Sequence, residues 1–341
     1  MNMARIRKTY KTICNLIVFI GAMLQSSGND TNPGSVQKPN PLEGPGTEEQ
    51  GVHFLHYSFE KYPENETEIA IPFQGITSID SNIKRLVKLE KLNLKNNKLK
   101  TLPSEIGDLV NLKILHLNGN NLETLPYEIG NLKSLHELDL SDNKLKLLPA
   151  GIRGMENLQE LYLRGNKLKL LPADIEKLKN LQHLDLSYNE FESLPAEIKG
   201  LENLKILHLN RNNLETLPSE IEKLKNLQIL LLGSNKLESL PSEIEKLKNL
   251  KVLLLGNNKL KLLPAEIGKL KNLNALGLRN NELETLPDTI RELSDSLQLL
   301  DLRGNNILEV GDGEWTLDKK KLREMFGDRV KFDGDVLREP Q

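Results

Sequence analysis

The chain has 341 residues, enough to bury a large core, and its aromatic content of 4% is low. Its 48 acidic and 46 basic residues give a formal net charge of −2, without the basic excess typical of nucleic-acid-binding proteins. With Cys14 as its one cysteine, the chain has no intrachain disulfides, so its stability must come from packing.

The first residues have the pattern of a secretory signal peptide. A basic start, MNMARIRKTYKT, precedes an apolar run at 13–24 and small residues at 26–28. The run is shorter than the ~20 residues of a membrane-spanning helix. The sequence therefore predicts a signal peptide at 1–28 and a secreted, extracellular protein. Two alternatives stay open: an uncleaved membrane anchor at 13–24, or an N-terminus that remains in the cytosol.

The next two segments differ in composition. Residues 29–50 are rich in Pro, Gly, Asn and Glu, which predicts a disordered linker. Residues 51–80 are interpreted as an N-terminal cap and a degenerate first repeat, in which Gln74 stands where later repeats have Asn. His53 and His56 lie next to aromatic residues there, and we interpret them as cap residues.

Residues 81–310 repeat the pattern L-x-x-L-x-L-x-x-N-x-L-x-x-L-P every 23 residues, except for a last interval of 24. In L-x-L, a strand turns its leucines inward and the intervening residue outward. An asparagine at the following turn can both donate and accept hydrogen bonds, and so pair with backbone groups of neighbouring repeats. We predict a structural asparagine ladder made of Asn97, Asn120, Asn143, Asn166, Asn189, Asn212, Asn235, Asn258, Asn281 and Asn305.

The proline and the E-I-x-x-L segment that follow predict a short helical turn with its apolar residues on one face. One unit cannot bury both its faces, so units must stack. The predicted fold is an α/β leucine-rich-repeat solenoid (horseshoe) with a parallel concave β-sheet and short helical or 3-10 segments on the convex side. Residues 311–341 are predicted to be a C-terminal cap helix and a tail, with helical spacing at 318–326.

The motif LPxEIxxLxNLxxLxLxxNxLxx, as in residues 218–240, resembles the 23-residue repeat of Ras-group leucine-rich-repeat proteins. The signal peptide, the cysteine-free caps and the ending KKKLREMFGDRVKF look like secreted leucine-rich-repeat proteins of microsporidian parasites. The resemblance implies protein–protein binding without a cofactor, and a role in host–parasite interaction. It identifies no partner, because the matching residues are the buried framework.

Function is expected in the outward residues of the strands, which fall into two regions. The first is polar, with Tyr162, His183, Asp185 and His208 on neighbouring strands and Tyr188 close by. Two imidazoles and a carboxylate are reasonable zinc ligands, and the same groups could suggest acid–base catalysis. Without a tight ligand-spacing motif or an enclosed pocket, however, we expect no metal, no cofactor and no enzyme activity.

The second region is apolar. Its members are predicted to form one exposed, contiguous patch consisting of Ile206, Ile229, Leu231, Val252 and Leu254. Gly233 and Gly256 are expected to leave a shallow floor beside it. Arg279, Asp301 and Arg303 are expected to form its polar rim. The alternative is that aliphatic residues simply fit strands well, or that duplication of one repeat copied the pattern.

The sequence thus predicts a secreted, non-catalytic module that binds a protein partner through the concave face, with no nucleic acid or small-molecule substrate. The alternative function is an intracellular signalling scaffold that contacts a small GTPase. It requires that residues 1–28 stay attached and do not direct export.

Overall fold

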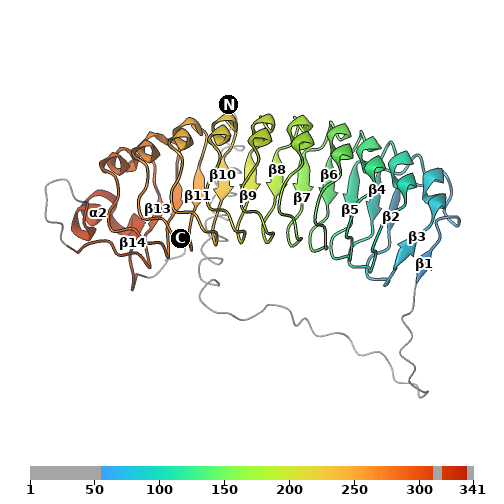
Figure 1. Cartoon of the computed structure of the whole chain (residues 1–341), viewed down its shortest axis with the longest axis horizontal. Coiled ribbons are helices and arrows are strands. Elements are labelled where there is room, and N and C mark those ends of the chain that lie inside the picture. The colour runs from blue at the N-terminus through green and yellow to red at the C-terminus, as the bar shows by residue number, and fades with distance from the viewer. Residues whose placement is uncertain (1–54, 310–316, 336–341) are drawn as a thin grey trace, which may run out of the picture. The chain divides into compact units, whose positions relative to one another are not determined.

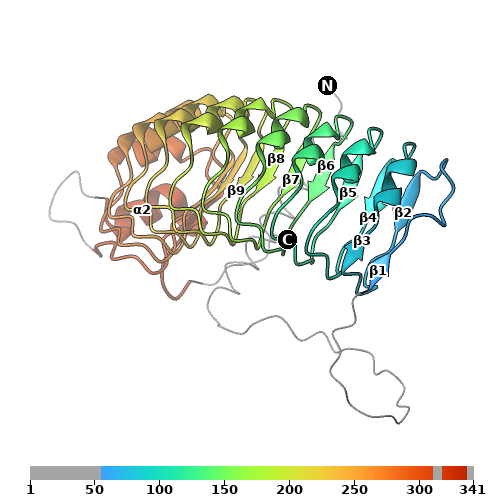
Figure 2. The same ribbon diagram turned by 45° about the vertical axis from the view of Figure 1, so that its right-hand side comes forward.

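The structure is a computed structural model that describes residues 55–309 and 317–335. Within these ranges the chain is a stack of repeats, each contributing one short strand, which in most repeats is followed by a 3-10 helix (Figure 1). The strands lie side by side, and the 3-10 helices form a second row that follows the sheet (Figure 2). The predicted α/β solenoid with a parallel sheet is confirmed.

All strand pairs of the main sheet are parallel, and each strand neighbours the next repeat's strand. The twelve strands are β2 (Glu68–Ala70), β4 (Lys91–Asn93), β5 (Ile114–His116), β6 (Glu137–Asp139), β7 (Glu160–Tyr162), β8 (His183–Asp185), β9 (Ile206–His208), β10 (Ile229–Leu231), β11 (Val252–Leu254), β12 (Ala275–Gly277), β13 (Leu299–Asp301) and β14 (Val330–Lys331).

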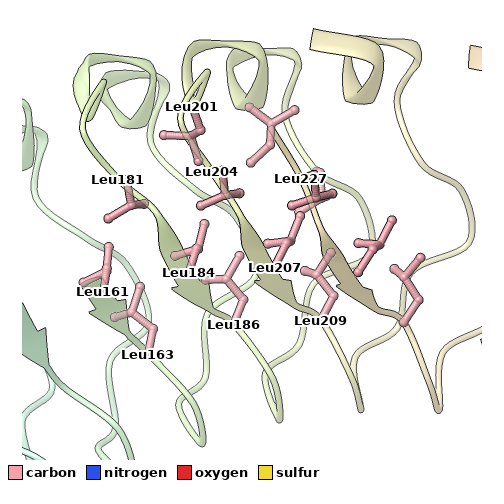
Figure 3. Close-up of a cluster of buried hydrophobic side chains, with 14 of the residues drawn as sticks. Leu161, Leu163, Leu181, Leu184, Leu186, Leu201, Leu204, Leu207, Leu209 and Leu227 are labelled. Carbon is pink, nitrogen blue, oxygen red and sulfur yellow. The ribbon is translucent and has the colours of Figure 1, made fainter. Parts of the chain in front are cut away.

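The period of 2 in the L-x-L motif places the core. The central leucine of each strand and the leucine after the strand are buried, as Leu184 and Leu186 of the β8 repeat are. Equivalent leucines stack from repeat to repeat into one continuous cluster (Figure 3). No single repeat could form such a core, because each buries its leucines against both neighbours.

A proline ends each loop and precedes the 3-10 helix in nine of the ten repeats that have one. These prolines have φ between −64° and −73°, and the isoleucine three residues later is buried, as for Pro218 and Ile221. The helices are Ser81–Arg85, Ser104–Asp108, Tyr127–Asn131, Ala150–Gly154, Ala173–Lys177, Ala196–Gly200, Ser219–Lys223, Ser242–Lys246, Ala265–Lys269 and Asp288–Leu293. The predicted short helical turns are thus 3-10 helices.

The ladder asparagines join adjacent repeats through the backbone. The Asn235 Oδ1 accepts a hydrogen bond from the Leu214 N–H at 3.0 Å, and its Nδ2 donates to the Leu209 and Leu232 carbonyls at 2.9 Å. Each of these carbonyls also accepts from a neighbouring ladder asparagine, Asn212 or Asn258. The ladder therefore shares its carbonyl acceptors between consecutive asparagines.

Gln74 does not extend this ladder. Its side chain is exposed and donates to the Pro72 carbonyl, whereas its backbone N–H donates to the Asn97 Oδ1 at 3.0 Å. Asn97 of the second repeat therefore bonds the backbone of the first repeat, whereas the Gln74 side chain does not take a ladder position.

The N-terminal cap is a small aromatic cluster. Strand β1 (His56–Tyr57) pairs in parallel with β3 (Ser78–Ile79) in a separate two-stranded sheet. Phe59 is fully buried between Tyr57 and Tyr62, whose hydroxyls lie 2.8 Å apart. His56 is exposed, and its Nδ1 lies 2.9 Å from the Ser78 hydroxyl.

The C-terminal cap is built on the predicted helix. Helix α2 (Lys319–Phe326) begins after Asp318, whose side chain accepts from the Lys321 N–H, and buries Leu322 and Phe326. After a 3-10 turn (Gly327–Arg329), β14 pairs with β13 and adds a strand that the sequence did not predict. The predicted signal peptide, the predicted linker, His53 and the last residues of the predicted tail lie outside the described residues.

Candidate protein-binding face

The outward residues of the strands form what we call the strand face. Strand pairing places these residues in two rows that stay in register from strand to strand. The first row is Lys91, Ile114, Glu137, Glu160, His183, Ile206, Ile229, Val252, Ala275 and Leu299. The second is Asn93, His116, Asp139, Tyr162, Asp185, His208, Leu231, Leu254, Gly277 and Asp301.

The polar half centres on the rings of Tyr162, His183 and His208, which lie in a row and which we call the ring stack. The His183 ring lies 4.8 Å from the Tyr162 ring and 5.1 Å from the His208 ring, both edge-to-face. The His208 Nδ1 lies 3.6 Å from the Asp185 carboxylate, which also accepts two hydrogen bonds from Ser187. The structure thus brings together the four polar residues predicted from the sequence.

Burial controls the protonation of this cluster. Burial, with a smaller contribution from His208, lowers the pKa of His183 to about 4, so its ring is neutral at neutral pH. Its Nε2 is buried without a hydrogen-bond partner, the one such side-chain atom found in the described residues. Burial would raise the pKa of Asp185, but His208 and Ser187 outweigh it and hold that pKa below its usual value.

Glu160 and Glu137 of this half are also paired with neighbouring side chains. The Tyr162 hydroxyl donates to Glu160 at 2.5 Å, and the His116 Nε2 lies 2.9 Å from Glu137. Burial, together with the hydrogen bond to Glu160, raises the pKa of Tyr162. The surface therefore presents rings and hydrogen-bonded carboxylates rather than isolated negative charges.

The described residues contain no group of three or more His, Cys, Asp or Glu side chains placed to hold a metal ion. His183, Asp185 and His208 are adjacent, but the contacts among them are the His183–His208 ring contact and the His208–Asp185 pair.

The apolar half is contiguous but less exposed than predicted. Ile206, Ile229 and Val252 are neighbours in one row, as are Leu231 and Leu254 in the other. Val252 is only 1% exposed and Leu231 only 8%, so the prediction of five exposed aliphatic residues is wrong for these two. Both lie outside the main core cluster, and aliphatic neighbours one strand away cover much of such a side chain.

Ile206, Ile229 and Leu254 remain partly exposed, and we call these three residues the apolar strip. Leu254 leans over β12, because a Cβ added to Gly277 would lie 2.8 Å from its Cδ2. The predicted floor at Gly233 is partly filled: the Asn210 side chain accepts a hydrogen bond from the Gly233 N–H at 2.7 Å.

The predicted polar rim also differs. Asp301 is fully buried, and Arg303 donates to it through Nε at 2.8 Å and Nη2 at 2.6 Å. Asp301 therefore positions the Arg303 side chain. The prediction that Asp301 forms part of an exposed polar rim is wrong. Arg279, from the β12 repeat, stays a candidate contact.

Comparison with known proteins places the chain in a family. Residues 77–167 and 198–276 match the leucine-rich repeat region family, and residues 156–197 match a family of paired leucine-rich repeats. The chain belongs to the leucine-rich-repeat proteins. No curated protein matches it.

Solved structures of leucine-rich-repeat proteins resemble this one. A protein of Leptospira interrogans is 35% identical over 76% of this chain and 81% of its own, with a TM-score of 0.47. The plant peptide hormone receptor RGFR1, solved in complex with RGF2, is 32% identical over 75% of this chain, with a TM-score of 0.58. A TDR receptor is 26% identical over 79% of this chain, with a TM-score of 0.67. This leucine-rich-repeat protein spans 46% and 47% of those two receptor chains.

Sequence reasoning missed two features of this leucine-rich-repeat protein. A second row of asparagines, on the exposed side near the 3-10 helices, donates to carbonyls of the preceding repeat at 2.7–2.9 Å; it comprises Asn111, Asn157, Asn180, Asn203, Asn226, Asn249 and Asn272. Leu170 and Leu262 are 60% and 65% exposed in the loops. In the described part of the chain, no helix has the length and apolar character needed to span a membrane.

Proposed function

We propose that this leucine-rich-repeat protein is a secreted, non-catalytic module that binds a protein partner through its strand face. The observation that carries the proposal is the juxtaposition, across β7 to β11, of the Tyr162–His183–His208 ring stack with the apolar strip. Protein interfaces pair such aromatic and aliphatic anchors with a polar surround.

The geometry of the face suits a partner that contacts several repeats at once. Ile206 belongs to the same strand as His208, so the ring stack and the apolar strip meet on β9. A partner laid across these strands could bury Ile206 and Ile229 while hydrogen-bonding the Tyr162 and Asp185 side chains. Arg279 lies farther along the array as a candidate polar contact.

The comparisons support binding of this kind without naming the partner. RGFR1 was solved in complex with RGF2, and PEPR1 with AtPEP1, and both receptors are 32% identical to this chain. Secretion is proposed from the N-terminal sequence pattern alone, and N-terminal sequencing of the native protein tests it. A start between Ser26 and Asn29 supports secretion, and a retained Met1 contradicts it.

The binding experiment changes two of the partly exposed aliphatic residues. We expect Ile229→Asp with Leu254→Asp to weaken binding at least ~100-fold, because a partner would have to bury two unpaired carboxylates. The matched control is Leu170→Asp with Leu262→Asp, two exposed leucines in loops outside the strands. The partner is captured from host and source-cell extracts, and its affinity is measured for each variant.

Circular dichroism and thermal unfolding must show that both double variants are folded. Equal affinity of the parent and the Ile229→Asp/Leu254→Asp variant contradicts the proposed face. A larger loss of affinity in the Leu170→Asp/Leu262→Asp control also contradicts it.

A further inference from the structure

The residue before each ladder asparagine adopts a left-handed backbone conformation. Most positions carry Gly, Asn or Asp, which tolerate it, namely Asn96, Gly119, Asp142, Gly165, Asn257, Asn280 and Gly304, and one carries the small residue Ser234. Two consecutive repeats carry bulky residues instead: Tyr188 has φ 56° and Arg211 has φ 55°. Phe73, with φ 58°, has the equivalent position before Gln74 in the first repeat and is not part of this consecutive pair. Bulky side chains are strained in this region, and strained residues concentrate at functional sites.

The two strained residues are packed together. The Tyr188 ring contacts two guanidinium groups, with the Arg164 Cζ 4.7 Å and the Arg211 Cζ 5.1 Å from its centroid. Arg164 comes from the preceding repeat, where Gly165 has the left-handed position and contributes no side chain. These three residues, which we call the edge cluster, lie just beyond the ends of β7, β8 and β9.

The edge cluster is exposed and carries unneutralised positive charge. Tyr188 is 43% exposed, and both arginines are exposed. In the described residues, no carboxylate lies within 4.0 Å of either guanidinium, whereas Arg85, Arg153 and Arg291 each have an acidic partner. The cation–π contacts hold both guanidinium forks in place, and a held fork suits bidentate binding of a carboxylate.

We propose that the edge cluster binds an acidic segment of a protein partner. The inference rests on the proposed function, protein binding by this array, and adds the chemistry of one contact outside the strand face. A nucleic acid fits less well, because its continuous phosphate backbone would also meet the acidic residues Glu137, Asp139 and Glu160 on the nearby strands. A short acidic segment needs to reach only the edge.

The test uses a phage-displayed library of random linear dodecapeptides, selected on the mature protein. We expect the selected peptides to be enriched in Asp and Glu relative to the library, and to lose affinity when their acidic residues become Gln or Asn. The key variant is Tyr188→Asn with Arg211→Asn, since asparagine already occupies the equivalent position at Asn96, Asn257 and Asn280.

In this variant we expect selected peptides to bind at least ~10-fold more weakly, while its Tm equals or exceeds that of the parent because strain is relieved. A merely structural role for the stack would instead lower the Tm. The Arg164→Gln variant should also weaken binding.

The Ile229→Asp/Leu254→Asp variant separates the two proposals, because it should still bind the selected peptides. Selection without acidic enrichment overturns the edge proposal, and so does unchanged affinity in the Tyr188→Asn/Arg211→Asn variant. Failure of the strand face would show differently, as unchanged affinity of the Ile229→Asp/Leu254→Asp variant for the captured partner.

Discussion

Replacing one ladder asparagine should destabilise the array by an amount that follows from its hydrogen bonds. Asn235→Leu keeps a similar side-chain volume but removes one acceptor and one donor group. The Leu214 N–H loses its Asn235 Oδ1 partner, and the Leu209 and Leu232 carbonyls lose the Asn235 Nδ2. These groups are buried between repeats, where water does not replace the lost partner.

The three losses are unequal. The Leu214 N–H is left unpaired, and a buried unpaired group costs about 1–3 kcal/mol. The two carbonyls keep a bond from Asn212 and Asn258, so each loses less than a fully unpaired group would. We therefore expect Asn235→Leu to lower the free energy of unfolding by about 3 kcal/mol, rather than the larger sum for three unpaired groups.

The matched control is Asn249→Leu in the following repeat. Asn249 also bonds a backbone carbonyl, that of Lys225 at 2.8 Å, but it is exposed, so water can take its place. We expect a loss of less than about 1 kcal/mol. Equilibrium urea unfolding, followed by circular dichroism, measures both. Equal effects of the two variants, or an Asn235→Leu variant as stable as the parent, would refute the ladder account.

Two further predictions concern stability. His183→Asn should remove a pH dependence of the free energy of unfolding. His183 protonates near pH 6.5 in the unfolded chain but only near pH 4 in the folded protein. Between pH 7 and pH 4 the free energy of unfolding should therefore fall by about 2–3 kcal/mol more in the parent than in the variant. The exposed His136→Asn is the control, and an unchanged parent-to-variant difference across this range would contradict the assigned burial. Gly130→Ala should lower the free energy of unfolding in urea by about 2 kcal/mol or more, because the Cβ of the new alanine would lie 1.8 Å from the Gly151 carbonyl oxygen. Asn131→Ala, at an exposed position of the same 3-10 helix, should change little, and equal stability of the two variants would contradict the close packing of adjacent helices.

The 23-residue period was sufficient to predict the fold and the register of the strand face. A fixed repeat length places equivalent residues side by side, so Ile229 had to pair with Val252, as it does. The period did not predict β14, because Val330–Lys331 is a two-residue strand after the last repeat and has no pattern of its own.

Exposure on the strand face could not be predicted from the sequence, because it depends on how neighbouring side chains lean. Leu254 leans over Gly277, and Asn210 covers Gly233. Alternation in a strand says only that Val252 points away from the core and not whether a neighbour covers it. The edge cluster was missed for a related reason: Arg164 and Arg211 are 47 positions apart in the sequence, and only the stacked repeats bring both to Tyr188.

Site-specific photocrosslinking tests the central claim, binding through the strand face, most directly. A photoreactive phenylalanine analogue placed at Ile206 or Ile229 should crosslink to the captured partner, because both residues belong to the apolar strip. The same analogue at Leu170 or Leu262, in the exposed loops, should give little crosslinking. Crosslinking from the loop positions and none from Ile206 or Ile229 would contradict the account.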